Sequence, residues 1–242
     1  MIKSQRPRAA KRAREGTDLA YRTGAGGAAA MDHVRALKTS SQLSERFRRM
    51  YNRGAVQVEP EAVVKVLNRA KVKFVLIGAH AVGGWTTEPR ATRDVDVLVH
   101  RRHHKRAVRA IQEAYPTLVV QDLAGVTRFN DPADGKPVID LMKPSDPVYR
   151  EAWKHTVPVG RTHQILDLEM TLAAKFAAMV SPNREKARKY LDAADFAQIV
   201  QRHYDRLNRS KLRRLGNKVY DKGGDEILKY VEDAKEGRTF SL

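Results

Sequence analysis

The chain has 242 residues, no cysteine and a formal net charge of +18 at pH 7. The lack of cysteine excludes disulfides, thiolate metal sites and cysteine nucleophiles, and it agrees with a reducing, cytoplasmic location. No run approaches the roughly 20 consecutive apolar residues of a membrane helix, so we expect no membrane partner. The positive charge favours a polyanionic partner, although a solvated basic surface accounts for it equally well.

The N-terminal segment, residues 1–56, is strongly basic, with 13 Lys or Arg against 4 Asp or Glu. We predict that residues 1–30 are disordered, because residues 23–30 (TGAGGAAA) form a Gly/Ala linker with nothing to bury. From Asp32 to Arg53 the pattern is only weakly helical, since apolar residues are sparse. The alternative that Met31 is the native start stays open at this stage.

The ordered core is expected to begin near Glu59 with a helix, a strand, a second helix and a second strand. Glu59–Lys71 carries apolar residues at helical spacing, and Lys73–Ile77 is a short run of strand formers. Gly78 ends this run, and a helix is expected to start within Ala79–Trp85. Asp94–Val99 (DVDVLV) alternates and then becomes apolar, which indicates a buried strand with one polar end.

The next elements are separated by clear turn signals. Arg101–Tyr115 has the pattern of an amphipathic helix and is followed by proline. Thr117–Gln121 and Gly125–Asn130 resemble strands. Asp131–Lys136 (DPADGK) is a strong turn, and Pro137–Met142 (PVIDLM) is a further strand.

Past this strand the sequence turns helical. Asp167 is a suitable N-cap for a helix over Leu168–Val180, and further helices are expected over Arg184–His203 and Asp225–Lys235. These elements predict an α+β fold, with a mixed β-sheet flanked by helices and followed by a helical C-terminal region. The expected divisions are a basic N-terminal segment (1–56), a core (57–158) and a helical C-terminal region (159–242).

Three aspartates form the main candidate site. Asp94 and Asp96 lie two apart on one expected strand, so both carboxylates share a face while Val95 and Val97 point into the core. At about 6 Å two carboxylates repel by roughly 3 kcal/mol at an effective dielectric of 20, which a divalent cation would offset. Asp140 is a costly charge inside the apolar PVIDLM strand. If the two strands are neighbours, the three carboxylates converge and a two-metal site is expected.

A competing interpretation is that nearby arginines neutralise these aspartates, and the candidates are Arg90, Arg93, Arg101 and Arg102. The histidines after the DVDVLV strand lack a fourth metal ligand at suitable spacing, so we expect them to start a basic helix. Trp85 and Trp153 are expected to be packing residues. The three histidines are His100, His103 and His104.

Gly78 lies between a strand and a helix, sixteen residues before Asp94. Free backbone N–H groups at a helix start, approached through a glycine, suit a phosphate group. Val64–Val99 resembles the core of minimal nucleotidyltransferases of the DNA polymerase beta-type superfamily, including the AbiEii-type toxin branch. The resemblance covers residues 57–203, and the matching residues are Gly78, Arg90, Thr92, Asp94, Asp96 and Asp140.

The resemblance implies a nucleotidyltransferase-type sheet and an Mg²⁺- or Mn²⁺-dependent transfer of a nucleoside monophosphate from a nucleoside triphosphate to an acceptor hydroxyl. Asp94 and Asp96 would hold metals, and Asp140 would bind the second metal and help to activate the acceptor. Ala79 stands where many members have glycine or serine, which removes a hydroxyl but keeps the backbone donors. The implied nucleotide-binding residues are Gly78, Ala79, Arg90, Thr92 and Lys175.

Lys175 lies on a largely apolar helix, where it either contacts the nucleotide or extends its ammonium to solvent. Asp192 and Asp195, three apart on a later helix, are expected to form ordinary salt bridges with neighbours such as Arg188 and Lys189.

The acceptor stays open between RNA, such as the tRNA of toxin members, a small molecule and a protein hydroxyl. The toxin resemblance also implies an antitoxin partner. One alternative function is a non-catalytic nucleic-acid-binding protein on a degenerate nucleotidyltransferase fold, and a weaker one is a metal-dependent nuclease that uses the same aspartates.

Overall fold

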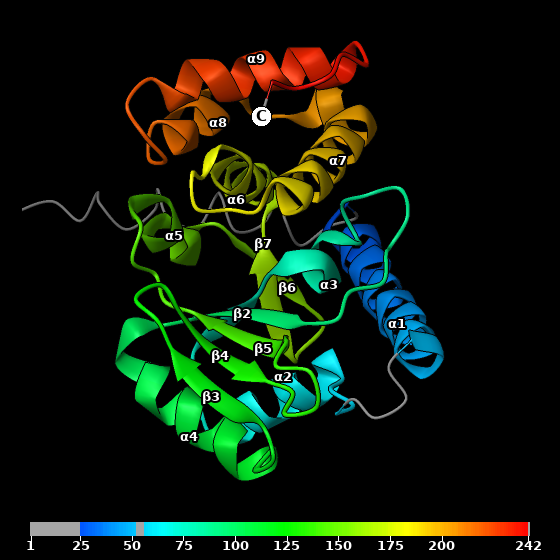
Figure 1. Cartoon of the computed structure of the whole chain (residues 1–242). Coiled ribbons are helices and arrows are strands. Elements are labelled where there is room, and N and C mark those ends of the chain that lie inside the picture. Colours follow the sequence, from blue (N-terminus) through cyan, green and yellow to red (C-terminus); the bar gives the residue numbers. More distant parts are fainter. Residues whose placement is uncertain (1–24, 52–55, 242) are drawn as a thin grey trace, which may run out of the picture.

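The computed structural model describes residues 25–51 and 56–241 of the chain. Seven strands in this part form one sheet, and they are β1 Phe74–Leu76, β2 Val95–Val99, β3 Val119–Asp122, β4 Val126–Asn130, β5 Pro137–Met142, β6 Thr156–Val159 and β7 His163–Leu166. Their order is β3-β4-β5-β2-β1-β7-β6 (Figure 1). β2 runs parallel to β5 and β1 parallel to β7, whereas the other neighbours are antiparallel, so the sheet is mixed.

Helices cover both sides of this sheet. The α-helices are α1 Ala25–Tyr51, α2 Pro60–Arg69, α3 Gly78–Val82, α4 His104–Ala114, α5 Pro147–Glu151, α6 Leu168–Val180, α7 Lys186–His203, α8 Arg209–Gly216 and α9 Gly223–Lys235. Figure 1 shows α2 and α4 below the sheet and α6 to α9 stacked above it. α1 packs against α3 and the edge strand β6. The expected α+β class, with a helical C-terminal region, is confirmed.

The core forms where apolar residues recur at the period of each element. Val95 and Val97 of β2 are fully buried, and they belong to one cluster with Leu67 of α2 and Ile111 of α4. Burial of a single side chain of this size contributes about 1.5–3 kcal/mol. Burial of these valines therefore fixes the register of β2. In this register Asp96, and Asp94 just before the strand, point to the opposite face of the sheet.

Two predicted elements match the structure residue for residue. β5 spans the PVIDLM run, and α6 spans Leu168–Val180. The side chain of Asp167 caps α6 by accepting a hydrogen bond of 3.0 Å from the backbone N–H of Met170. The cap satisfies one of the free N–H groups of the first turn, as its sequence position predicts.

The expected linker over residues 23–30 is wrong from Ala25 onward, because α1 begins there. Alanine is the strongest helix former, so the alanines of this run favour the first turns of α1, which continues through the basic residues that follow. The predictions for residues 1–24 lie outside the described residues.

The expectation that the chain is helical past the PVIDLM strand is also wrong, because β6 and β7 form an antiparallel hairpin there. β7 joins the sheet beside β1, so the sheet continues past residue 158, the expected end of the core. β6 is an edge strand, where Pro158 is tolerated because its missing N–H is not needed by a second neighbour. A four-residue run with a proline carries little strand signal. The short helix α8 was likewise not expected.

Within the described residues, none of the helices combines the length and the apolar character that crossing a bilayer requires.

Candidate active site

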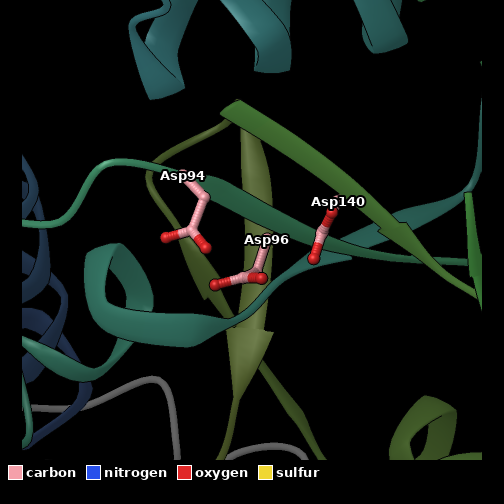
Figure 2. A group of neighbouring side chains, drawn as sticks. All are labelled: Asp94, Asp96 and Asp140. Carbon is pink, nitrogen blue, oxygen red and sulfur yellow. The ribbon is translucent and has the colours of Figure 1, made fainter. Parts of the chain in front are cut away.

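Three carboxylates meet on one side of the sheet. β2 and β5 are parallel neighbours, and their register places Asp96 directly beside Asp140. Asp94 immediately precedes β2, and its side chain lies on the same side as that of Asp96 (Figure 2). One carboxylate oxygen from each of the three residues lies within 4.8 Å of the others. The expected convergence of the three aspartates is confirmed.

The glycine turn lies against this cluster. Gly78 has a φ of +69°, and a Cβ there would lie 2.0 Å from Oδ2 of Asp96, so only glycine fits. The backbone N–H of Ile77 donates to the carbonyl of Asp96 at 3.0 Å, which ties the turn to β2. The first N–H groups of α3, at Gly78 and Ala79, have no partner within the helix. The turn thus offers backbone donors next to the carboxylates.

The carboxylates oppose one another electrostatically. Burial, followed by the charges of Asp94 and Asp140, raises the pKa of Asp96 well above its ordinary value. Burial also raises the pKa of Asp140 to about 6, against the lowering effect of Arg128. At 4.8 Å a carboxylate pair costs about 3 kcal/mol at an effective dielectric of 20.

One oxygen of this cluster lacks a partner. Oδ1 of Asp140 is buried and accepts no hydrogen bond within the part of the chain that the structure describes. An excess of negative charge, three oxygen donors and an unsatisfied acceptor together form the donor set that a hard divalent cation prefers. The residues present therefore fit a metal ion.

The arginines near Asp94 in sequence do not neutralise the cluster. Arg90 donates through two nitrogens to Asp195, each at 3.2 Å. Arg93 pairs with Asp134 and Asp131. Arg101 and Arg102 form no ion pair with the three aspartates in the described ranges. As ion-pair partners of the three aspartates, Arg90, Arg101 and Arg102 therefore do not match the competing interpretation.

Two other arginines approach the cluster from more distant segments. Nε of Arg128 lies 3.5 Å from Oδ2 of Asp140, and Nη1 of Arg188 lies 3.6 Å from Oδ2 of Asp94. Their side chains are 41% and 50% exposed, so solvent screens both pairs. Asp96 has no ion pair among the described residues, and the three negative charges are only partly balanced.

Thr92 orients Asp94, and α1 holds the loop that carries both. Oγ1 of Thr92 donates to Oδ1 of Asp94 at 2.7 Å, and its backbone N–H donates to Oγ of Ser44 at 3.0 Å. Oγ of Ser40 donates to the carbonyl of Arg90 at 2.9 Å. Sequence reasoning missed both serines. The available signal was two serines four apart on a weakly helical segment, which is too common to single them out.

Lys175 is buried where α6 meets α7. Its ammonium donates to Oδ1 of Asp192 at 2.9 Å and to Oδ2 of Asp195 at 2.5 Å. Extension of this side chain to solvent is therefore wrong. Nε of Arg184 donates to Asp192 at 2.6 Å, and Arg90 completes the group through Asp195. The expected pairing of these aspartates with Arg188 and Lys189 is also wrong, because this face of α7 turns toward α6.

Asp96 and Asp140 line one cleft of about 410 Å³ together with Lys175, Arg184 and Asp192 of the charge network. The residues that line it do not include Ala79, Arg90, Thr92, Asp94 or Asp195. The network holds three cations and two carboxylates, so its net charge is +1. Tyr149 also lines the cleft, and burial raises its pKa to about 12, so its hydroxyl stays protonated. The polar residues and the glycine of its lining include Gly78, Asp96, Asp140, Ser145, Tyr149, Lys175, Arg184 and Asp192.

The histidines after β2 begin a basic helix, as expected. They lie at the start of η1 (Arg101–His103) and α4, and Nδ1 of His103 accepts from the backbone N–H of Lys73 at 2.8 Å. They belong to no group of potential metal ligands in the described ranges. Among the described residues, the candidate metal ligands are therefore the three aspartates.

No protein-family profile matches this sequence, and no curated protein matches it either. Among solved structures, the chain is similar to an antigenic nucleotidyltransferase-like protein from Paracoccidioides brasiliensis, with 14% identity and a TM-score of 0.41 over 74% of this chain and 91% of that chain. It is also similar to terminal uridylyl transferase 4 from Trypanosoma brucei with bound GTP, with 9% identity and a TM-score of 0.28 over 83% of this chain and 97% of that chain. Likenesses at this level assign no activity to the chain.

Proposed function

We propose that this chain is an Mg²⁺-dependent nucleotidyltransferase of the minimal type. In the reaction, an acceptor hydroxyl attacks the α-phosphorus of a nucleoside triphosphate. The new P–O bond forms as the bond to pyrophosphate breaks. The observation that carries the proposal is the meeting of three carboxylates from two neighbouring strands beside a glycine turn, at the edge of a cleft.

The three aspartates have separate roles in this proposal. Asp94 and Asp96 would hold divalent cations, Mg²⁺ or Mn²⁺, together with Asp140. When bound, the cations supply positive charge for the phosphoryl oxygens. Asp140 would also help to activate the acceptor hydroxyl, because its carboxylate lies beside Asp96 in the cleft. Its unpartnered Oδ1 is the atom available for that role.

The nucleotide would lie across the cleft from the glycine turn to the charge network. The backbone N–H groups of Gly78 and Ala79 would donate to phosphate oxygens, and the alanine still provides a backbone donor. The net positive charge of the network would attract the triphosphate, and its cations are Lys175, Arg90 and Arg184. Such catalysis depends mostly on positioning and electrostatic stabilisation.

The proposed acceptor, protein partner and location of this chain follow from the sequence and its charge. The AbiEii-type resemblance suggests an RNA acceptor such as tRNA and an antitoxin partner, and the absence of cysteine agrees with a cytoplasmic location. The net charge of +18 agrees with a polyanionic acceptor.

The test is transfer of label from each of the four α-labelled nucleoside triphosphates to total RNA or protein, with and without Mg²⁺. Asp94→Asn should abolish transfer while the protein stays folded. Asp205→Asn, at an exposed aspartate with no ion pair among the described residues, should transfer normally. Transfer by Asp94→Asn at the wild-type rate would refute the site. RNA binding without Mg²⁺-dependent triphosphate binding would instead favour a non-catalytic nucleic-acid-binding protein.

A further inference from the structure

A second pocket, of about 580 Å³, opens beside the catalytic cleft. We call it the basic pocket, and it is lined by His100, Arg101, His104, Lys105, Ala124, Lys143, Pro144, Ser145, Arg150 and Trp153. Ser145 lines both this pocket and the cleft, and Ala124 of the pocket is followed by Gly125 of the cleft. The two pockets are therefore neighbours that share one lining residue.

The lining of the basic pocket is strongly cationic. It contains four Lys or Arg side chains and no carboxylate. Lys143 is engaged by Asp122 at 2.7 Å. Arg101, Lys105 and Arg150 are exposed, and none of them forms an ion pair within the described part of the chain. Three unpaired charges at one pocket are expected to bind a polyanion.

The pocket also has an aromatic wall. The rings of His100 and Trp153 are 5.3 Å apart and inclined by 66°. Trp153 is partly exposed, and the Nζ atom of Lys73 lies 5.5 Å from the centroid of its ring. Unpaired nucleotide bases stack on such rings, whereas the bases of a duplex are already stacked on one another. Cations and an aromatic wall together suit a single strand better than a duplex or an acidic protein.

We propose that the basic pocket binds a single-stranded polynucleotide, the acceptor strand, whose end lies in the catalytic cleft. The inference rests on the proposed function for the role of the strand, but binding itself requires no transfer. Phosphates lie against Arg101, Lys105 and Arg150, and one base stacks on Trp153.

The charge test uses the full chain and a labelled single-stranded RNA of about 12 nucleotides, followed by fluorescence anisotropy without nucleotide or Mg²⁺. The triple variant Arg101→Gln, Lys105→Gln and Arg150→Gln should lose affinity by roughly tenfold or more, with a salt slope smaller by about 2. The control variant Lys65→Gln, Arg69→Gln and Arg214→Gln removes the same charge from exposed sites elsewhere and should lose much less. Equal losses in the two triple variants would overturn the proposal.

The stacking test uses Trp153, one of only two tryptophans in the chain, the other being the buried Trp85. RNA should quench tryptophan fluorescence in the wild type but not in Trp153→Leu. That variant should bind RNA roughly 5- to 100-fold more weakly, and Trp153→Phe should restore most of the affinity. Unchanged affinity of Trp153→Leu, or competition by polyglutamate as strong as by RNA, would overturn the proposal.

Further experiments distinguish RNA from DNA as the bound strand and separate the binding proposal from the enzyme proposal. Single-stranded DNA of the same sequence distinguishes RNA from DNA within the polynucleotide class. RNA bound at the pocket without any transfer would remove the enzyme proposal and keep this one. Mg²⁺-dependent triphosphate binding without RNA binding would do the reverse.

Discussion

At the scale of single residues, the three aspartates form an arrangement that costs stability unless their charges are balanced. Asp140 is buried beside two other carboxylates, and burial raises its pKa to about 6 from an ordinary 3.8. The folded state therefore holds this proton more tightly than the unfolded state. The resulting stability is fully present below about pH 4 and is lost as pH rises through about 6.

Asp140→Asn should consequently be more stable than the wild type at about pH 7 without divalent cations, by on the order of 2–3 kcal/mol at most. Below about pH 4 the two proteins should differ little. The measurement is denaturant unfolding in a metal chelator at several pH values. The control Asp205→Asn should show no such pH-dependent gain. A variant less stable than the wild type at neutral pH would contradict the electrostatic account.

Addition of Mg²⁺ should reverse this order. Any ligand that binds only the folded state stabilises it in proportion to the logarithm of its concentration. Mg²⁺ should raise the melting temperature of the wild type and have little effect on Asp140→Asn. An equal shift in both proteins would place the cation elsewhere.

Gly78 provides a second prediction at this scale, with Gly135 as its matched control. Their φ angles are +69° and +68°, but a Cβ would meet Asp96 at Gly78 and nothing within 4 Å at Gly135. Gly135→Ala should cost about 1–2 kcal/mol from the left-handed backbone alone. Gly78→Ala should cost about 1–3 kcal/mol more and weaken Mg²⁺ binding, because Asp96 must move. Equal free energies of unfolding for the two variants would show that the turn does not constrain Asp96.

At the scale of elements, the charge network depends on how α6 and α7 pack. Lys175 of α6 bridges Asp192 and Asp195 of α7, and its side chain is only 9% exposed. Lys211 of α8 makes a similar bridge to Asp167 and Glu169, outside the cleft, at 16% exposure. The two lysines thus have the same structural role, but only one of them borders the cleft.

Lys175→Met and Lys211→Met should each cost about 3–5 kcal/mol, because each leaves two carboxylates without their shared cation. Only Lys175→Met should also weaken Mg²⁺-dependent triphosphate binding, measured by calorimetry at a temperature where both variants are folded. If both variants bind triphosphate equally well, Lys175 has a structural role alone.

The sequence predicted the elements whose signal is dense and local. β5 and α6 have long apolar runs bounded by turns or a cap, and their bounds match. β6 and β7 have four residues each, and their stability depends on pairing with each other and with β1. That pairing leaves no local pattern, so the hairpin was missed.

At the scale of the whole molecule, the excess charge is unevenly spread. Residues 1–24 contain seven Lys or Arg and two Asp or Glu, whereas the residues that line the catalytic cleft lie between Ile77 and Asp192. We expect these N-terminal cations to attract polyanions, whereas triphosphate binding should depend on the described cleft residues.

Deletion of residues 1–24 should lower RNA affinity at low salt and reduce the salt dependence of binding, while triphosphate binding with Mg²⁺ stays the same. A full-length variant with these seven cations changed to glutamine should behave like the deletion, which separates charge from length. Loss of triphosphate binding in either protein would contradict this division.

The sequence by itself determined that Asp94 and Asp96 share a face, because a strand alternates its side chains with a period of two. It also determined that Asp140 is a charge within an apolar strand. Only the tertiary structure decided that β2 and β5 are parallel neighbours and that Lys175 faces Asp192 and Asp195. These contacts join segments far apart in the chain, and strand order and helix packing are decided by the burial of the whole core rather than by any local pattern.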